Sequence, residues 1–320
     1  MKLHQLQALA AVADAGSIRA AARVLGLSQA AVTKALRELE SELRLPLLQR
    51  TARGVAFTPH GQRLLSHARL VVGQIERANA EVAEMRGDLA SQGGRLSIAL
   101  TPWVMFAFLP ETLRRFREQM PGVQFECFEG LTAVTLPRLR EGLIDFAMVP
   151  FTPSMSPQEF DSEPLLAFDS SVIAHRDHPL ANETSLHRLL DHDWAVNYTA
   201  ASYPALMQNL FWQHGAEIEP RRLHCAHSTA LMLEMVHRSG MLSFCPAPLL
   251  RTDPLRGWAQ PLPLAQRFDT TELGIIGRRN AVRGTAAQCF VDCLAGTIRR
   301  RARSAAPEDR ELFDVLKVLF

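Results

Sequence analysis

The sequence predicts an α/β protein with a small helical N-terminal part, one long helix and a larger two-lobed body. Three observations support this fold class: short amphipathic helices broken at Gly16 and Gly26, a heptad spacing of apolar residues over 64–89, and alternating strand and helix patterns from Leu96 onward. The chain has 320 residues, whereas single cores seldom grow beyond about 250 to 300 residues. We therefore expect several separate cores.

The composition is that of a folded globular protein. Apolar residues make up 47% of the chain and charged residues 21%, without a long polar tract. The uncharged stretch 96–110 contains two prolines and is shorter than the roughly 20 residues of a membrane-spanning helix. Gln5, Gln7 and Asp14 interrupt any signal-peptide core near the N-terminus. We expect a cytoplasmic protein without a membrane segment.

Charge is unevenly distributed along the chain. Residues 1–70 contain ten Lys and Arg against four Asp and Glu, a local charge of +6, although the whole chain carries only +2. A basic N-terminal head on a mildly acidic body is typical of a protein whose head binds a polyanion. The alternative is a basic surface that only keeps the protein soluble.

The segment 16–40, "GSIRAAARVLGLSQAAVTKALRELE", predicts two short helices joined by a tight turn. Ser17 and Ser28 are suited to cap the two helices, and Gly26 to adopt the left-handed conformation that ends the first. The pair forms a helix-turn-helix, whose second helix can enter a DNA major groove. The alternative is an ordinary helical hairpin with a solvated charged face. The candidate DNA-contacting residues on the second helix are Gln29, Ala30, Thr33, Lys34 and Arg37.

The next stretch, "LPLLQRTARGVAFTPHG", predicts a β-hairpin that carries Arg50 and Arg53 at its tip. In a winged helix-turn-helix such a tip contacts the phosphate backbone, and binding of this kind depends strongly on salt. We place the winged helix-turn-helix domain at residues 1–58.

Residues 59–90 predict a long linker helix. Its apolar positions alternate in steps of three and four, which is the seam of a helix that packs along a partner helix. We expect dimerisation, the alternative being a helix of an intramolecular bundle. The candidate dimerisation residues are Leu64, Val71, Ile75, Val82, Met85 and Leu89.

From residue 91 the pattern is β-α-β-α-β, followed by a second set of strands and helices. We expect a ligand-binding body over 91–301, with lobe I at about 91–163 and 268–301 and lobe II at about 164–267. One of its strands is expected near 163–176. The remaining segment, 302–320, is predicted as a C-terminal tail helix with an apolar stripe that includes Leu312 and Leu316.

Two α/β lobes leave a cleft, and open sheets bind ligands beyond the carboxyl ends of their strands. Each residue at such an end can equally be a cap or a core residue. The candidate ligand-binding residues are Thr101, Pro102, Trp103, Gly130, Leu131, Thr132, Phe151, Tyr198, Thr199, His227, Ser228 and Thr229. Aromatic residues among them favour a small aromatic or apolar-bodied acid as the ligand.

Enzyme motifs are missing from the sequence, which contains no G-x-S-x-G, G-x-G-x-x-G, Walker or H-E-x-x-H pattern. The five cysteines lack C-x-x-C spacing, so we expect buried thiols and neither metal nor cofactor. A solute-binding protein or a small enzyme with an oligomerisation head is the rival class, which the basic head disfavours.

The chain resembles a LysR-type transcriptional regulator over nearly its full length. The resemblance is carried by "AVADAGSIRAAARVLGLSQAAVTKALRELESELRLPLLQRT", "FTPHGQRLL", "GRLSIALTP", "LREGLIDFAMV" and "HPL". It implies a winged helix-turn-helix, a linker helix and an effector domain resembling periplasmic binding proteins. It further implies a homotetramer, double-stranded DNA and RNA polymerase as partners, and a small-molecule effector bound between the lobes.

Matched by position, the resemblance places the recognition helix, the wing and the cleft on the residues named above. It adds Ser28 to the DNA-contacting residues and Ala133 to the cleft. Ala30 departs from the family, because many members have proline there, and Leu48 replaces a common phenylalanine. The tail extends beyond the usual end of the family. A cysteine-based redox sensor of the same family remains the alternative function.

Overall fold

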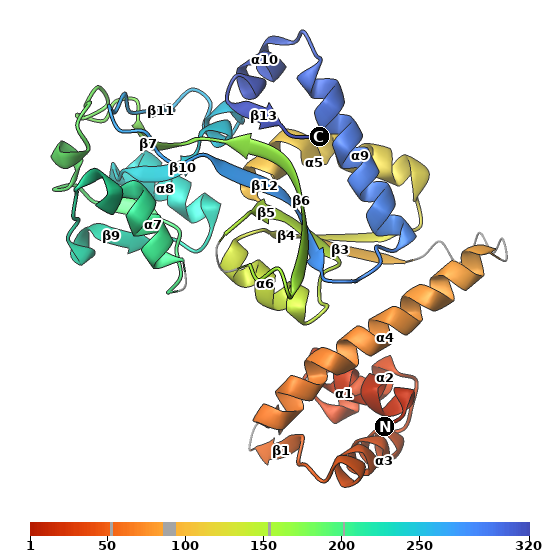
Figure 1. The fold of residues 1–320 in the computed structure, drawn as a ribbon. Helices are drawn as coiled ribbons and strands as arrows, with labels where there is room; N and C mark the ends of the chain where they lie inside the picture. The colour runs from red at the N-terminus through yellow and green to blue at the C-terminus, as the bar shows by residue number, and fades with distance from the viewer. Residues whose placement is uncertain (52–53, 86–93, 153–154, 201) are drawn as a thin grey trace. The chain divides into compact units, whose positions relative to one another are not determined.

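The computed structural model describes residues 1–51, 54–85, 94–152, 155–200 and 202–320. They form two compact units (Figure 1). The first unit is built on Met1–Leu96, and the second contains most of the remaining chain. Within the described ranges, no helix is long and apolar enough to cross a membrane.

The head begins with α1 (Leu3–Ala15), α2 (Ile18–Val24) and α3 (Gln29–Leu43). Gly16 and Gly26 have φ angles of 72° and 65°, the left-handed conformation that glycine adopts without strain. The Ser17 hydroxyl accepts the Ala20 N–H at 3.1 Å, and the Ser28 hydroxyl accepts the Ala31 N–H at 3.1 Å. These caps and turns confirm the predicted helix-turn-helix.

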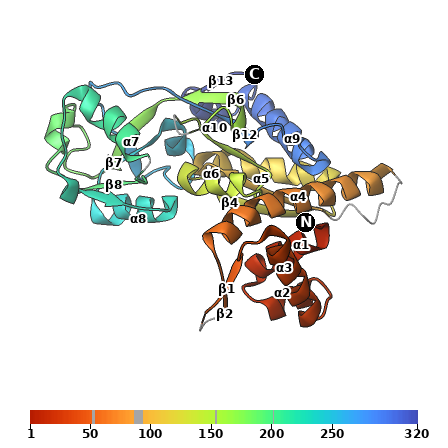
Figure 2. The same ribbon diagram turned by 60° about the horizontal axis from the view of Figure 1, so that its bottom comes forward.

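The wing is an antiparallel hairpin of β1 (Leu48–Thr51) and β2 (Gly54–Phe57), drawn beside the three helices in Figure 2. Apolar residues of the hairpin pack on the same core as α1 to α3. The following helix, α4 (Pro59–Met85), adds Leu65 and Ala68 to that core. The head is therefore one packed body that includes the start of the long helix.

Lobe I is built on a six-stranded mixed sheet with the strand order β13-β6-β12-β5-β3-β4. Parallel pairing joins β3 and β5, while β12 runs antiparallel to both β5 and β6. These strands are β3 (Arg95–Leu100), β4 (Gln124–Glu129), β5 (Phe146–Pro150), β6 (Phe160–Phe168), β12 (Thr271–Arg278) and β13 (Leu316–Val318).

Helices of lobe I are α5 (Pro102–Gln119), α6 (Thr132–Arg140), α9 (Thr285–Ala302) and α10 (Pro307–Phe313). The rings of Phe116 on α5 and Phe290 on α9 are 5.5 Å apart, and Phe146 on β5 lies 6.1 Å from Phe290. These aromatic contacts pack both helices against the sheet.

Lobe II contains two small sheets around a core that includes Trp194 and Phe211. In one sheet β7 (Ser170–His175) lies between β10 (Ser243–Pro246) and β11 (Ala259–Pro261), and in the other β8 (Trp194–Val196) pairs in parallel with β9 (Leu223–Cys225). The helices are α7 (Tyr203–Leu210) and α8 (Thr229–Ser239), with 3-10 turns η2 (Leu186–Leu189), η3 (Trp212–His214), η4 (Pro220–Arg222) and η5 (Ala247–Arg251).

The lobe boundaries differ from the predicted ones. The strand expected near 163–176 is two strands, because β6 belongs to the lobe I sheet and β7 to lobe II. The chain therefore crosses at Asp169, and it returns at 270, since Phe268 packs 4.9 Å from Phe244 in the lobe II core. The Thr270 hydroxyl donates to the Asp169 carboxylate at 2.6 Å, which pins the two crossing segments together.

The tail 302–320 is not the single helix that its apolar stripe predicts. Pro307 begins a separate short helix, α10, and Leu316–Val318 form β13, which pairs with the free edge of β6. An open strand edge offers backbone hydrogen bonds that a helical continuation would forgo. Leu312 and Leu316 are buried in this arrangement.

Candidate nucleic-acid interface and ligand site

The first two turns of α3 present polar and charged side chains to solvent. Gln29, Ala30, Lys34 and Arg37 are exposed, as is the capping residue Ser28. Thr33 is half-buried and its hydroxyl donates to the Gln29 carbonyl at 2.8 Å. The Lys34 side chain is 78% exposed and its Nζ lies 3.8 Å from Glu38 Oε1, so the ammonium is available to a polyanion.

Glu40 connects α3 to the wing through hydrogen bonds that were not predicted from the sequence. Its Oε1 accepts the N–H groups of Leu47 and Leu48 at 2.8 and 3.0 Å. Thr58 closes the other end of the hairpin, since its hydroxyl donates to the Pro46 carbonyl at 2.7 Å. The wing is therefore held at a set position beside α3 by side-chain bonds to its backbone.

Arg50 lies on β1 opposite Val55, which places its backbone in the hairpin. Its side chain and the whole of Arg53 lie outside the described residues. A contact of the wing tip with phosphate remains a prediction.

The heptad seam of α4 divides into two parts. Leu64 is partly buried against the head core and Ala68 is fully buried there, so this end of the seam is used inside the head. Farther along, Val71 and Val82 are 42% and 45% exposed, and Ile75 is half-buried. Met85 ends the helix with its side chain outside the described set, and Leu89 lies wholly outside it.

In lobe I, the predicted ligand residues gather where β3 and β4 end. Thr101 begins α5 and its N–H donates to the Met148 carbonyl at 2.9 Å, while the Gly130 N–H donates to the Leu100 carbonyl at 2.7 Å. Pro102 occupies the first position of α5, and Leu131 precedes α6. Thr132 and Ala133 start α6, their side chains being outside the described set.

In lobe II, the candidate residues gather beyond β8 and β9. The Cys225 thiol donates to the Tyr198 carbonyl at 3.3 Å, and the Thr199 N–H donates to Ser202 Oγ at 2.9 Å. Tyr198 packs edge-on against Tyr203 at 5.2 Å, and burial raises the pKa of its phenol above the ordinary value. His227 is exposed, and Ser228 caps α8 through the Leu231 N–H at 3.1 Å.

Glu129 joins the two groups of residues. It is the last residue of β4, and its Oε1 accepts the N–H of Thr229, the first residue of α8, at 2.8 Å. Glu129 was not among the residues predicted from the sequence, although its position immediately before Gly130 at a strand end was the available signal.

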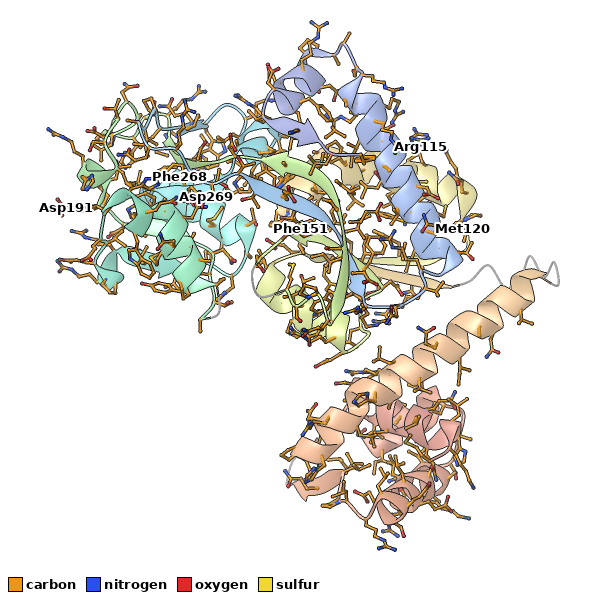
Figure 3. The ribbon with its side chains drawn as sticks, in the orientation of Figure 1. Arg115, Met120, Phe151, Asp191, Phe268 and Asp269 are labelled. Carbon is orange, nitrogen blue, oxygen red and sulfur yellow. The ribbon has the colours of Figure 1, made fainter. Side chains whose placement is uncertain are left out.

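Two aromatic candidates occupy different surroundings. Trp103 is 1% exposed and packs edge-on against Phe168 at 5.4 Å, so its ring belongs to the lobe I core. A large apolar side chain in the first turn of α5 is more stable when it is buried in the core than when it faces a cleft. Phe151 is half-buried and lies beside β12, its N–H donating to the Glu272 carbonyl at 2.9 Å (Figure 3).

Three of the thiols are poorly suited to redox chemistry, because their pKa is raised. Burial raises the pKa of Cys245 to about 12 and that of Cys127 to about 11. The pKa of Cys289 rises to about 11, through burial first and the nearby Cys293 second. Cys225 is half-buried, with its sulfur 3.7 Å from His227 Nε2. In the described part of the chain, no group of three His, Cys, Asp or Glu is placed to hold a metal ion.

Two family models match the chain. The model of the bacterial regulatory helix-turn-helix protein of the lysR family matches residues 3–62, and the LysR substrate binding domain matches residues 90–299. Together these two matches cover the head and the two-lobed body.

Curated relatives agree with these matches. MetR of Salmonella typhimurium is 31% identical over 241 residues, 74% of this chain and 72% of that protein. GalR of Pseudomonas putida is 26% identical over 300 residues, 93% of this chain and 75% of that protein. TdcA of Escherichia coli is 27% identical over 218 residues, 68% of this chain and 69% of that protein. All three are described as HTH-type transcriptional regulators.

Solved structures share the fold. A full-length OxyR variant from Pseudomonas aeruginosa aligns with a TM-score of 0.68 at 17% identity, covering 97% of both chains. Full-length CbnR in complex with its target DNA aligns with a TM-score of 0.61 at 21% identity, covering 93% of this chain and 100% of that one.

Proposed function

Because the chain belongs to the LysR-type family of DNA-binding transcriptional regulators, we propose that it binds a two-fold symmetric DNA site and that a small molecule held between its lobes controls this activity. The observation that carries the DNA-binding part is the exposed start of α3, where Gln29, Lys34 and Arg37 face solvent beside a firmly anchored wing. Glutamine suits adenine, and lysine and arginine suit guanine or phosphate.

The assembly that we propose is a homodimer joined along α4, two of which form a homotetramer. Two exposed valines at heptad spacing on a charged helix support this arrangement. Two heads joined in this way read two half-sites separated by whole turns of DNA. At the promoter, RNA polymerase is the further partner that we propose.

The effector that we propose is a small acid with an aromatic or apolar body. Leu131, Tyr198 and Phe151 are half-buried near the strand ends, and Val134 and Leu231 are 51% and 52% exposed on α6 and α8. The start of α5 supports a carboxylate, because the positive end of the helix lies there and Thr101 makes no side-chain cap to the Trp103 N–H. Trp103 is left out of this ligand site because it is buried.

The alternative is a redox-sensing regulator of the same family. The Cys225–His227 contact is the observation that favours it, because a neighbouring imidazole can activate a thiol. The raised pKa of Cys127, Cys245 and Cys289 disfavours it, since the thiolate is the form that an oxidant attacks.

The test is a footprint and a binding titration on DNA upstream of the protein's own gene, at several salt concentrations. We expect a symmetric protected region, and a loss of at least about 30-fold in affinity for K34A combined with R37A, because each base contact contributes about 1–3 kcal/mol. K317A, which removes an exposed lysine of β13, is the matched control and should bind normally.

Absence of protection by the wild-type protein at low salt, or equal binding by the double variant, would contradict the proposed DNA contact. Repeating the titration with hydrogen peroxide separates the two triggers. Unchanged affinity supports the small-molecule effector, whereas a change abolished by C225S would establish the redox alternative.

A further inference from the structure

The Glu129–Thr229 hydrogen bond links the two lobes at the start of α8. An α-helix leaves its first N–H groups without partners inside the helix. In α8 the Ser228 side chain accepts one of them, from Leu231, and the carboxylate of Glu129 in lobe I accepts another, from Thr229. Lobe I thus supplies a negative charge at the positive end of a lobe II helix.

The link lies far from the segments that connect the lobes. The chain crosses between the lobes after β6 and before β12, and these strands are neighbours in the lobe I sheet. Beyond β12 the strand order is β5, β3 and then β4, the edge strand that ends at Glu129. At about 4.8 Å per strand, roughly 14 Å separate β4 from β12. A rotation about the crossing segments therefore moves Glu129 much more than it moves β12.

The crossing segments form a defined pivot. Asp169 and Thr270, one from each segment, are joined by a 2.6 Å hydrogen bond. A rotation of the lobes can occur about this joined pair without separating it. The Glu129–Thr229 bond, at the β4 edge of the lobe I sheet, would have to break.

Both ends of the link are rigidly mounted. A Cβ atom on Gly130 would lie 2.6 Å from the Leu100 carbonyl carbon, so the end of β4 lies directly against the end of β3. In lobe II the Asn197 side-chain amide donates to the Ala226 carbonyl at 2.6 Å and fixes the segment that leads into α8. The bond therefore depends on the position of whole lobes.

We propose that the Glu129–Thr229 bond is a latch that holds the two lobes together, and that the lobes separate to admit an effector only when it breaks. The role in effector entry rests on the proposed function. The latch itself is a property of the two lobes and requires neither DNA nor effector for its test.

Hydrogen exchange of the full-length protein, followed by mass spectrometry, measures the latch. E129A removes the acceptor of the bond from the Thr229 N–H. E129Q keeps an acceptor oxygen but removes the negative charge, and a hydrogen bond between neutral groups is roughly half as strong as one to a charged group. We expect exchange in the segments 97–101, 124–131 and 226–232 to accelerate about tenfold in E129A and by a smaller factor in E129Q. A tenfold change corresponds to about 1.4 kcal/mol.

E126Q is the matched control, because Glu126 lies on the same strand and accepts the Ser97 hydroxyl at 2.9 Å within lobe I. It should leave exchange in 226–232 unchanged. Acceleration confined to 229–232 in E129A would reduce the contact to a local helix cap and overturn the latch, as would exchange equal to wild type in all three segments. Either result leaves the DNA-binding test unaffected, so failure of the latch and failure of the proposed function are separable.

Discussion

At the scale of the single residue, Gly61 shows how closely the head is packed. It lies in the first turn of α4, where its N–H donates to the Thr58 hydroxyl at 3.1 Å. A Cβ atom at this position would meet the Leu47 carbonyl oxygen at 2.0 Å, and that oxygen already accepts the Thr58 N–H at 2.9 Å. The glycine is required by close approach of the backbone and not by an unusual φ angle.

We expect G61A to destabilise the head by about 1–3 kcal/mol, because backbone must shift to make room for the methyl group. In a domain of this size that lowers the head's melting temperature by roughly 5–20 °C. Differential scanning calorimetry of the full chain measures the change.

G73A is the matched control for this experiment. Gly73 lies in the same helix, and a Cβ atom there would have no neighbour within 4 Å. Alanine should be neutral there or stabilising by about 0.4–1 kcal/mol. Equal effects of the two substitutions would contradict the close packing at Gly61.

Among the elements, α4 changes its surroundings along its length. Its first turns belong to the head core through Leu65 and Ala68, whereas Val71 and Val82 remain exposed. Burying a valine against a partner contributes about 1.5–3 kcal/mol, and a carboxylate at that position adds a desolvation cost.

We expect V71E combined with V82E to weaken self-association at least about 100-fold, measured by sedimentation over a range of protein concentrations. V24E is the matched control, because Val24 ends α2 in the head and is 74% exposed without lying on the seam. An unchanged assembly in the double variant would show that α4 is not the contact between copies.

At the scale of the whole molecule, two compact units should unfold separately. The C-terminal tail belongs to the second of them. It buries Leu312 and Leu316, extends the sheet through β13, and places Asp309 2.5 Å from Arg301. The tail is therefore expected to stabilise the effector domain and not the head.

Truncation after Ala306 should lower the free energy of unfolding of the effector domain by about 3–6 kcal/mol, the value for two buried leucines. The corresponding melting transition should fall by on the order of 10 °C, while the head transition stays in place. Calorimetry distinguishes the two transitions, and K317A serves as a control for the exposed face of β13. A truncated chain as stable as the full one would contradict a structural role of the tail.

Features with local signals could be predicted from the sequence. Ser17, Gly26 and Ser28 define the helix-turn-helix through capping and φ angles within a few residues, and period-two and heptad patterns located the strands and α4. The residues that follow β3, β4, β8 and β9 were likewise predicted as candidate ligand residues, because the end of each strand pattern marks them.

Features that depend on residues distant in the chain became visible only in the folded protein. The split at Asp169, the conversion of the tail into α10 and β13, and the burial of Trp103 each follow from a partner more than 50 residues away. The Glu129–Thr229 contact spans 100 residues and leaves no periodic trace in the sequence. Local patterns record which face of an element is buried, whereas the choice of partner depends on how separate elements meet in space.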